Sequence, residues 1–386
     1  MKNKIAIASA FLAAASFSTA EIVVNEFLSF EGFVDSSYSH TDTDSDNPSE
    51  NGSENSFQVD QVEISWLFNF DTVTAQIDLQ YEGDSLDGQF GRPSGADGEL
   101  VEQAFVNYAL GNGDVVTAGR YASMLGFEAF EPTGLYQSSF AYTGGIALDN
   151  LYQKDDADGV EEFYDEDENS DYSVLPGYDQ GVKYTYESGN TFYGISVVDG
   201  SYNRGRLGGD VEDTANRDSE SGYGVEVAGA YSMDNGVSVF LGARYDDGDD
   251  YDSTVYNAYV TYETGAWLFA AELAYGEEDS NVSGTTNDDS DLLNAMLLAN
   301  YAYSDVASVT GRLSYIDDEE EDDGLASGSD ETDFFKYTLA HNYAFTDNLL
   351  LRTEISYIDG EFDEAGATAS EDFDETTLVV EVLFSF

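Results

Sequence analysis

Residues 73–82 read Val-Thr-Ala-Gln-Ile-Asp-Leu-Gln-Tyr-Glu, with apolar side chains at odd positions and polar side chains at even positions. This period of two predicts a β-strand with one apolar face and one polar face. The same alternation recurs later in the chain, for example at 236–246, 348–358 and 375–386. The chain is therefore predicted to be a β-protein whose sheet separates an apolar environment from a polar one.

Sixteen segments of this kind are predicted as strands. They span 27–38, 57–70, 73–83, 99–110, 114–121, 179–188, 191–199, 222–232, 236–246, 253–263, 266–276, 291–303, 306–316, 332–344, 348–358 and 375–386. Most run for about ten residues, which is the length that a tilted strand needs to cross the hydrocarbon layer of a membrane.

The connections between these segments alternate between short and long. Short connections include 71–72, 264–265 and 304–305, whereas long ones begin at Ser39, Asp84, Ala122, Gly200, Asp247, Glu277, Asp317 and Asp359. Tight turns on one side, long loops on the other and an even strand number are typical of outer-membrane barrels. The predicted fold is all-β: a single transmembrane antiparallel up-and-down β-barrel of about 16 strands, with both termini in the periplasm.

The first twenty residues have the features of a secretory signal peptide. Lys2 and Lys4 precede an apolar run at 5–17, and small residues at 18–20 offer a cleavage site. The predicted organisation is a signal peptide at 1–20 and an outer-membrane β-barrel at 21–386.

The far end of the chain also matches an outer-membrane protein. Phe386 ends the last apolar-alternating segment. A terminal Phe on such a strand resembles the signal for the outer-membrane assembly machinery of Gram-negative bacteria. Tyr, Trp and Phe also gather near both ends of the predicted strands, where headgroup-level aromatic belts are expected. Outer-membrane lipid and the assembly machinery are therefore the expected partners.

Composition excludes several classes of function. The chain has 386 residues, 78 Asp or Glu against 13 Lys or Arg, and a formal net charge of -65. A nucleic-acid binder needs clusters of Lys and Arg, which are missing here. The absence of cysteine removes disulfides, thiolate metal sites and cysteine nucleophiles together.

One connection, at 122–178, far exceeds the usual loop length, and loops of this length are usually functional or disordered. It is the third outer loop, and by analogy with general porins it is predicted to fold into the lumen. Its first half carries apolar residues that need cover: Met124, Leu125, Phe127, Phe130, Leu135, Tyr136, Phe140 and Tyr142. Its second half is strongly acidic.

Several motifs around this loop carry a family resemblance. They are the segment 102–110, Thr117-Ala118-Gly119-Arg120-Tyr121, Gly126-Phe127-Glu128, the segment 135–139 and the segment 197–203. Together they resemble the OmpL-like outer-membrane β-barrel porin family, most distinctly over 99–203. The resemblance implies a water-filled diffusion channel for small hydrophilic solutes and ions, and it supplies no catalytic residues.

The few basic residues of the predicted strands are all assigned to the polar face. A charge that faces lipid at mid-height costs about 2–4 kcal/mol, so any barrel would require this placement. We further predict that five of them line a constriction opposite acids of the inward loop, with Glu128 pairing with Arg120. The predicted basic set is Arg120, Lys183, Arg312, Lys336 and Arg352. The predicted acidic set is Asp155, Asp156, Asp158, Glu161 and Glu162. Further inward acids are Glu63, Asp78, Glu82, Glu187, Glu272, Glu354 and Glu381.

The excess of acids in the outer loops predicts a cation-preferring channel. Asp42, Asp44 and Asp46 resemble the start of a calcium loop, but Asn47 replaces the required Gly and the EF-hand pattern fails. No cofactor and no defined metal site are expected, and acidic outer loops are expected to hold divalent cations loosely.

Two other functions stay open at this stage. A barrel with a plugged lumen would serve a structural or adhesive role. An outer-membrane hydrolase would use a Ser-His pair that contains His40 or His341, or a pair of acids that the sequence does not single out among its many carboxylates. His341 lies where a belt residue is expected and His40 lies in an acidic loop, so the hydrolase is the least favoured. By analogy with other porins, the oligomer is expected to be a homotrimer.

Overall fold

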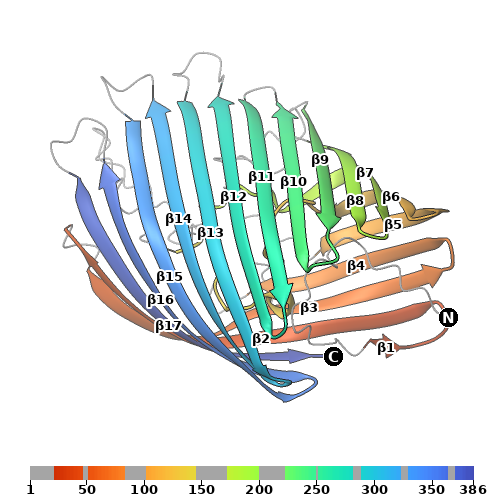
Figure 1. The fold of residues 1–386 in the computed structure, drawn as a ribbon, viewed down its shortest axis with the longest axis horizontal. Coiled ribbons are helices and arrows are strands. Elements are labelled where there is room, and N and C mark those ends of the chain that lie inside the picture. Colours follow the sequence, from red (N-terminus) through yellow and green to blue (C-terminus); the bar gives the residue numbers. More distant parts are fainter. Residues whose placement is uncertain are drawn as a thin grey trace, which may run out of the picture.

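A computed structural model describes residues 21–46, 51–82, 101–144, 172–199, 222–248, 251–280, 288–322, 329–363 and 370–386. In these parts the chain forms an antiparallel sheet in which sixteen long strands pair in sequence order and β17 closes on β2 (Figure 1). The strands are β1 Ile22–Val23, β2 Leu28–Ser45, β3 Gly52–Phe70, β4 Val73–Glu82, β5 Val101–Gly111, β6 Asp114–Ala122, β7 Tyr178–Ser188, β8 Thr191–Val198, β9 Tyr223–Ser232, β10 Val237–Asp247, β11 Tyr251–Thr264, β12 Trp267–Ser280, β13 Asp288–Ser304, β14 Ala307–Asp322, β15 Ser329–Thr346, β16 Leu349–Asp363 and β17 Glu371–Ser385. The fold is a closed up-and-down barrel, and the predicted signal peptide at 1–20 lies outside the described residues.

All sixteen predicted strands are confirmed. Their ends at the short turns agree within about two residues, and the opposite ends of β2, β3 and β11 to β17 reach two to seven residues further than predicted. β14, for example, continues to Asp322 through a run of acids that has no alternation of polarity. Among the strands of the described residues, only β1 was missed, and it pairs through two residues with β2. Alternation therefore locates the part of each strand that has two different faces, and it fails beyond that part.

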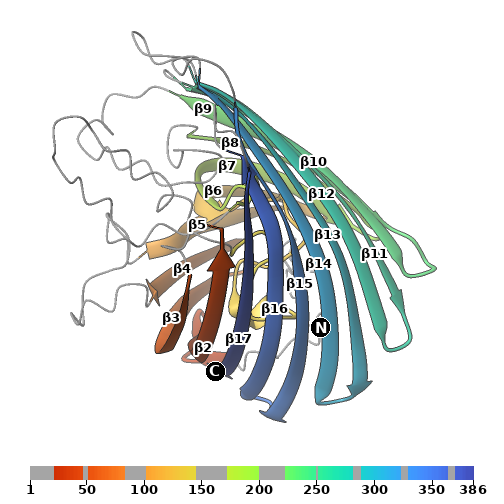
Figure 2. The same cartoon turned by 90° about the vertical axis from the view of Figure 1, so that its left-hand side faces the viewer.

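The outward face of the barrel is apolar. Leu241, Leu297 and Leu339 are more than half exposed, while both strand neighbours of Leu297 and of Leu339 are buried. Near the short turns, Trp267 stacks on Tyr301 with ring centroids 4.5 Å apart. The exposed face therefore suits hydrocarbon and its aromatic rim suits the headgroup region. Strands β10 to β17 run side by side with a common tilt (Figure 2).

Within the described residues, no helix is both long enough and apolar enough to cross a bilayer.

Part of the inward face is covered by non-strand chain, namely residues 123–144 and 172–177, here called the inner segment. It contains one short 3-10 helix, η2 Pro132–Gly134. Leu125 and Phe127 of the inner segment share a buried apolar cluster with Phe240 and Phe334 of the wall. Tyr172 also meets Phe334 edge to face at 5.2 Å. Most apolar side chains of the inner segment are thus buried, whereas Phe140 is 39% exposed.

Candidate functional site

The inner segment begins with backbone N–H groups that are bound by acids of the wall. Glu226 on β9 accepts a hydrogen bond from the N–H of Met124 at 2.8 Å. Glu272 on β12 accepts one from the N–H of Phe127, also at 2.8 Å. Both carboxylates are buried, so these charge-assisted bonds satisfy groups that water does not reach. Strands β9 and β12 therefore fix the entry of the inner segment.

Two of the predicted cations hold the middle of the inner segment. The Arg312 guanidinium pairs with Glu128 at 2.7 Å and donates to the carbonyl of Phe140 at 2.9 Å. The Lys336 ammonium donates to the carbonyls of Phe140 and Thr143 at 3.0 and 2.6 Å. Both basic residues are at most 4% exposed. Arg312 and Lys336 therefore bind backbone carbonyls of the inner segment and have little contact with water.

Arg352 anchors the turn around η2. Its guanidinium forms a buried ion pair with Glu381 at 2.7 Å. The other amino group donates to the carbonyls of Pro132 and Leu135 at 3.1 and 3.0 Å. Arg352 is only 1% exposed, and Nε and both amino groups of its guanidinium donate hydrogen bonds to protein acceptors.

Lys183 lies at the point where β6 leads into the inner segment. Its ammonium donates to the carbonyl of Ala122 at 3.0 Å and sits 4.3 Å from the centroid of the Tyr121 ring. The Tyr121 hydroxyl in turn contacts the Ser196 hydroxyl at 2.9 Å. Tyr121 was predicted to face the aromatic belt, but it faces inward and is only 3% exposed.

The placement of Arg120 differs from the prediction. The register of β6 on β7 aligns Arg120 with Gln180, two positions beyond the pair of Ala118 with Val182. Val182 is 53% exposed on the outward face, so Arg120 takes that face and not the face of Lys183. The strand lacks the contrast between large apolar and polar residues that would reveal its parity. Glu128, predicted to pair with Arg120, pairs with Arg312.

The acidic half of the predicted constriction lies outside the described residues. It comprises Asp155, Asp156, Asp158, Glu161 and Glu162. Of the inward acids, Glu272, Glu354 and Glu381 all bind the inner segment. Glu226 was missed, although its position between Val225 and Val227 carries the same parity signal.

The neighbouring wall, β2 to β4, presents acids and amides on its inward face. Glu31, Gln61, Gln76 and Gln80 are partly exposed there. The basic residues of the described inward wall are buried beneath the inner segment or, for Arg244, between acids. Water in the lumen therefore meets amides and carboxylates on this side.

Both histidine rings contact an oxygen atom of another strand. The His40 ring contacts the carbonyl of Glu54 at 3.0 Å, between β2 and β3. The His341 ring contacts the Tyr303 hydroxyl at 2.6 Å in an exposed position near the short turns. Among the described residues, neither ring is bonded to a serine hydroxyl, which a Ser-His hydrolase requires.

Comparison with known proteins places the chain among porins. The family model described as beta-barrel porin-2, OmpL-like, matches residues 28–150 and 170–386. No curated protein sequence matches significantly.

Solved structures share the fold at low sequence identity. An anion-selective porin from Comamonas acidovorans has a TM-score of 0.57 at 14% identity, covering 93% of this chain and 99% of that one. The outer-membrane channel DcaP of Acinetobacter baumannii has a TM-score of 0.56 at 11% identity, with 93% and 97% covered. OmpT, an outer-membrane protein of Vibrio cholerae, has a TM-score of 0.53 at 12% identity, with 95% and 100% covered.

Proposed function

Because this chain belongs to the OmpL-like β-barrel porin family, we propose that it is a cation-preferring diffusion channel for small hydrophilic solutes in the outer membrane of a Gram-negative bacterium. The observation that carries the cation preference is the burial of the wall cations. Arg312, Lys336 and Arg352 are each at most 4% exposed and bind carboxylates or carbonyls. Arg312 and Arg352 are each paired with a carboxylate and Lys336 is covered by backbone carbonyls, so they add little positive potential to the lumen.

The acids outnumber these cations by a wide margin. The chain carries 78 Asp and Glu against 13 Lys and Arg. Fixed charge acts across about 8 Å at physiological ionic strength, so acids close to the path enrich cations there. Glu31 supplies one such acid on the partly exposed inward face of β2. In this proposal the inner segment narrows the path and selectivity comes from the wall opposite it.

Reversal potentials of the purified protein in planar bilayers test the proposal. A potassium chloride gradient should give the sign of cation selectivity. Lys336→Met is the informative variant. If Lys336 faced the lumen, this substitution would strongly raise cation selectivity. If Lys336 is a buried anchor, as we propose, the substitution should leave selectivity nearly unchanged and increase the noise of the current. A wild-type potential of the anion-selective sign would contradict the proposal.

A plugged barrel with a structural or adhesive role is the second candidate. The apolar contact of the inner segment with the wall favours it, because Phe127 and Tyr172 fill inward space beside Tyr259 and Phe334. The same bilayer experiment separates the two. A folded barrel that inserts but passes no current would establish the plug. A homotrimer is part of the proposal, and the native molecular mass in detergent measures it.

A further inference from the structure

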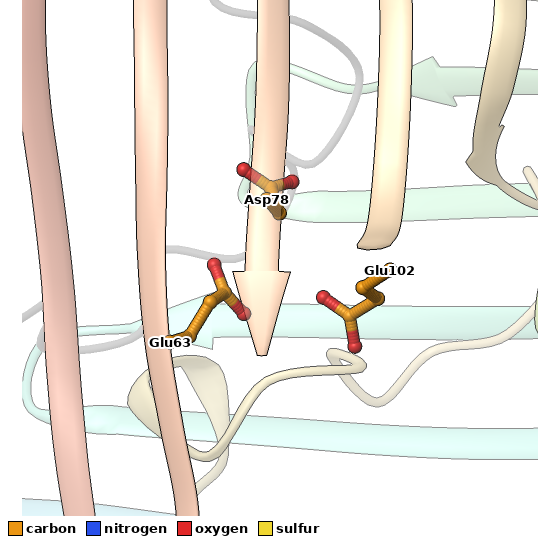
Figure 3. A group of neighbouring side chains, drawn as sticks. All are labelled: Glu63, Asp78 and Glu102. Carbon is orange, nitrogen blue, oxygen red and sulfur yellow. The ribbon is translucent and has the colours of Figure 1, made fainter. Parts of the chain in front are cut away.

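Three acids from consecutive strands meet on the inner wall. Glu63 on β3, Asp78 on β4 and Glu102 on β5 are each at most 5% exposed. One carboxylate oxygen from each lies within 4.8 Å of the others (Figure 3). The three acids lie on different strands from the anchors Arg312, Lys336 and Arg352, which are on β14 to β16.

The strand register brings these acids together. Asp78 pairs with Ser65 on β3, two positions from Glu63, so both side chains share the inward face. On its other side, Asp78 pairs with Gln103, and the register of β4 and β5 shifts immediately beyond. The irregularity turns Glu102 toward the same point, where regular alternation would have directed it outward.

The hydrogen bonds available do not satisfy this cluster. Ser65 donates to Glu63 at 2.7 Å, and the amides of Gln76 and Gln103 each donate to Asp78 at 2.8 Å, so Asp78 is the satisfied member. Oε2 of Glu63 and Oε2 of Glu102 are buried and accept no hydrogen bond from the described residues. None of the ion pairs formed by described residues reaches the three acids. A buried carboxylate without a partner is costly, so this group needs a positive charge.

A fourth acid joins the cluster from the inner segment. The Glu131 carboxylate lies close enough to Glu63 and Glu102 to interact with both electrostatically. It also accepts hydrogen bonds from Gln61 at 3.0 Å and from the Tyr178 hydroxyl at 2.8 Å. Burial raises the pKa of Glu131 above its usual value. The cluster thus spans three wall strands and the chain just before η2.

We propose that Glu63, Asp78, Glu102 and Glu131 form a calcium site that ties the inner segment to the barrel wall. Calcium takes six to eight oxygen ligands at about 2.3–2.6 Å, so two of its ligands lie at most about 5 Å apart. Magnesium holds its ligands at about 2.0–2.1 Å and needs a tighter set. The three carboxylate oxygens lie within 4.8 Å of one another, which is inside the span that the ligands of one calcium ion can cover. The site is independent of solute selectivity and goes beyond the proposed channel function.

Calorimetric titration of the refolded full-length barrel with calcium chloride tests this proposal. High potassium chloride should be present, because it screens weak binding to the acidic outer strands. The wild type should show one saturable site. Glu102→Gln and Glu63→Gln should each weaken it by at least tenfold. Each variant removes a charge that lacks a partner, so folding should persist, and a heat-dependent mobility shift on electrophoresis checks that.

Glu361→Gln on β16 is the matched control, because it removes an exposed acid of the outer region and should leave the site unchanged. Calcium should also raise the thermal midpoint of the wild type and of Glu361→Gln, but not of Glu102→Gln. Absence of saturable binding in the folded wild type would overturn the proposal and leave protons as the neutralising ions. Equal binding by all variants would overturn it as well.

Discussion

Single buried residues act as joints between the inner segment and the wall, and Arg352 is the clearest of them. It is 1% exposed, pairs with Glu381, and binds two carbonyls beside η2. Arg352→Met should destabilise the barrel by about 3–5 kcal/mol, because it leaves a buried carboxylate without its counter-ion. The urea midpoint of tryptophan fluorescence in detergent measures the change. Combining Arg352→Met with Glu381→Gln should recover part of the lost stability. A double variant with the same urea midpoint as Arg352→Met would contradict this interpretation.

Strand parity predicted the direction of these residues but not their partners. Arg312, Lys336 and Arg352 lie on strands of strong alternation. Because side chains alternate between the two faces with a period of two, the apolar neighbours of each residue predict that it points inward. Arg120 lies beside Gly119 in a strand of small residues. No large apolar side chain marks the outward face of that strand, and the predicted inward direction of Arg120 was wrong. What each cation binds depends on how the long connection folds back, and no local pattern encodes that.

At the scale of the element, side chains of the inner segment pack against glycines of the wall, in space that a larger wall residue would fill. A Cβ added to Gly242 on β10 would lie 2.2 Å from a methyl carbon of Leu125. An alanine there displaces only the end of a flexible side chain, whereas Gly242→Leu cannot be absorbed in this way. We expect Gly242→Leu to cost about 1–3 kcal/mol and to lift the start of the inner segment. Single-channel conductance should increase.

Gly229 on β9 provides the control for this effect. Only the carbonyl oxygen of Phe192, at 3.8 Å, would lie near an added Cβ at that position. Gly229→Ala should therefore keep wild-type conductance and stability. If Gly242→Leu conducts like the wild type while remaining folded, Leu125 does not position the inner segment.

Titration of Glu131 should control the same element. Burial raises its pKa in the folded protein, against a value of about 4.3 in an unfolded chain. The folded state therefore binds this proton more tightly, and the resulting stability is complete below the unfolded pKa and is lost as pH rises through the folded pKa. Without divalent cations, raising the pH should loosen the inner segment and increase channel noise in bilayer recordings. Glu131→Gln should weaken this dependence, since Glu63 and Glu102 remain beside it, and an unchanged pH profile in that variant would contradict the assignment.

For the whole molecule, acids that the sequence assigned to outer loops lie on extensions of β13, β14 and β15, and form an acidic surface there. The register places Asp291 opposite Glu319, Glu319 opposite Glu331, and Glu320 opposite Asp330. Such runs read as loops, because polar residues occupy both faces and alternation disappears. The extensions exist because backbone pairing continues upward from the apolar part of each strand, although directly opposed like charges are unfavourable.

This surface should make the outer ends of the barrel sensitive to ionic strength. The screening length falls from about 30 Å at 0.01 M to about 3 Å at 1 M, so salt weakens repulsion between opposed carboxylates. Amide hydrogen exchange at 288–291 and 317–322 should slow as sodium chloride is raised, while 293–303 of the same sheet should not change. Equal exchange at both salt concentrations would show that the repulsion is already compensated. Sodium suffices here because the charge is diffuse and exposed. Hydrogen exchange near the buried cluster of Glu63, Asp78 and Glu102 should not change with sodium chloride and should slow only with calcium chloride. Titrating the protein with each salt therefore distinguishes screening of a charged surface from binding at a defined site.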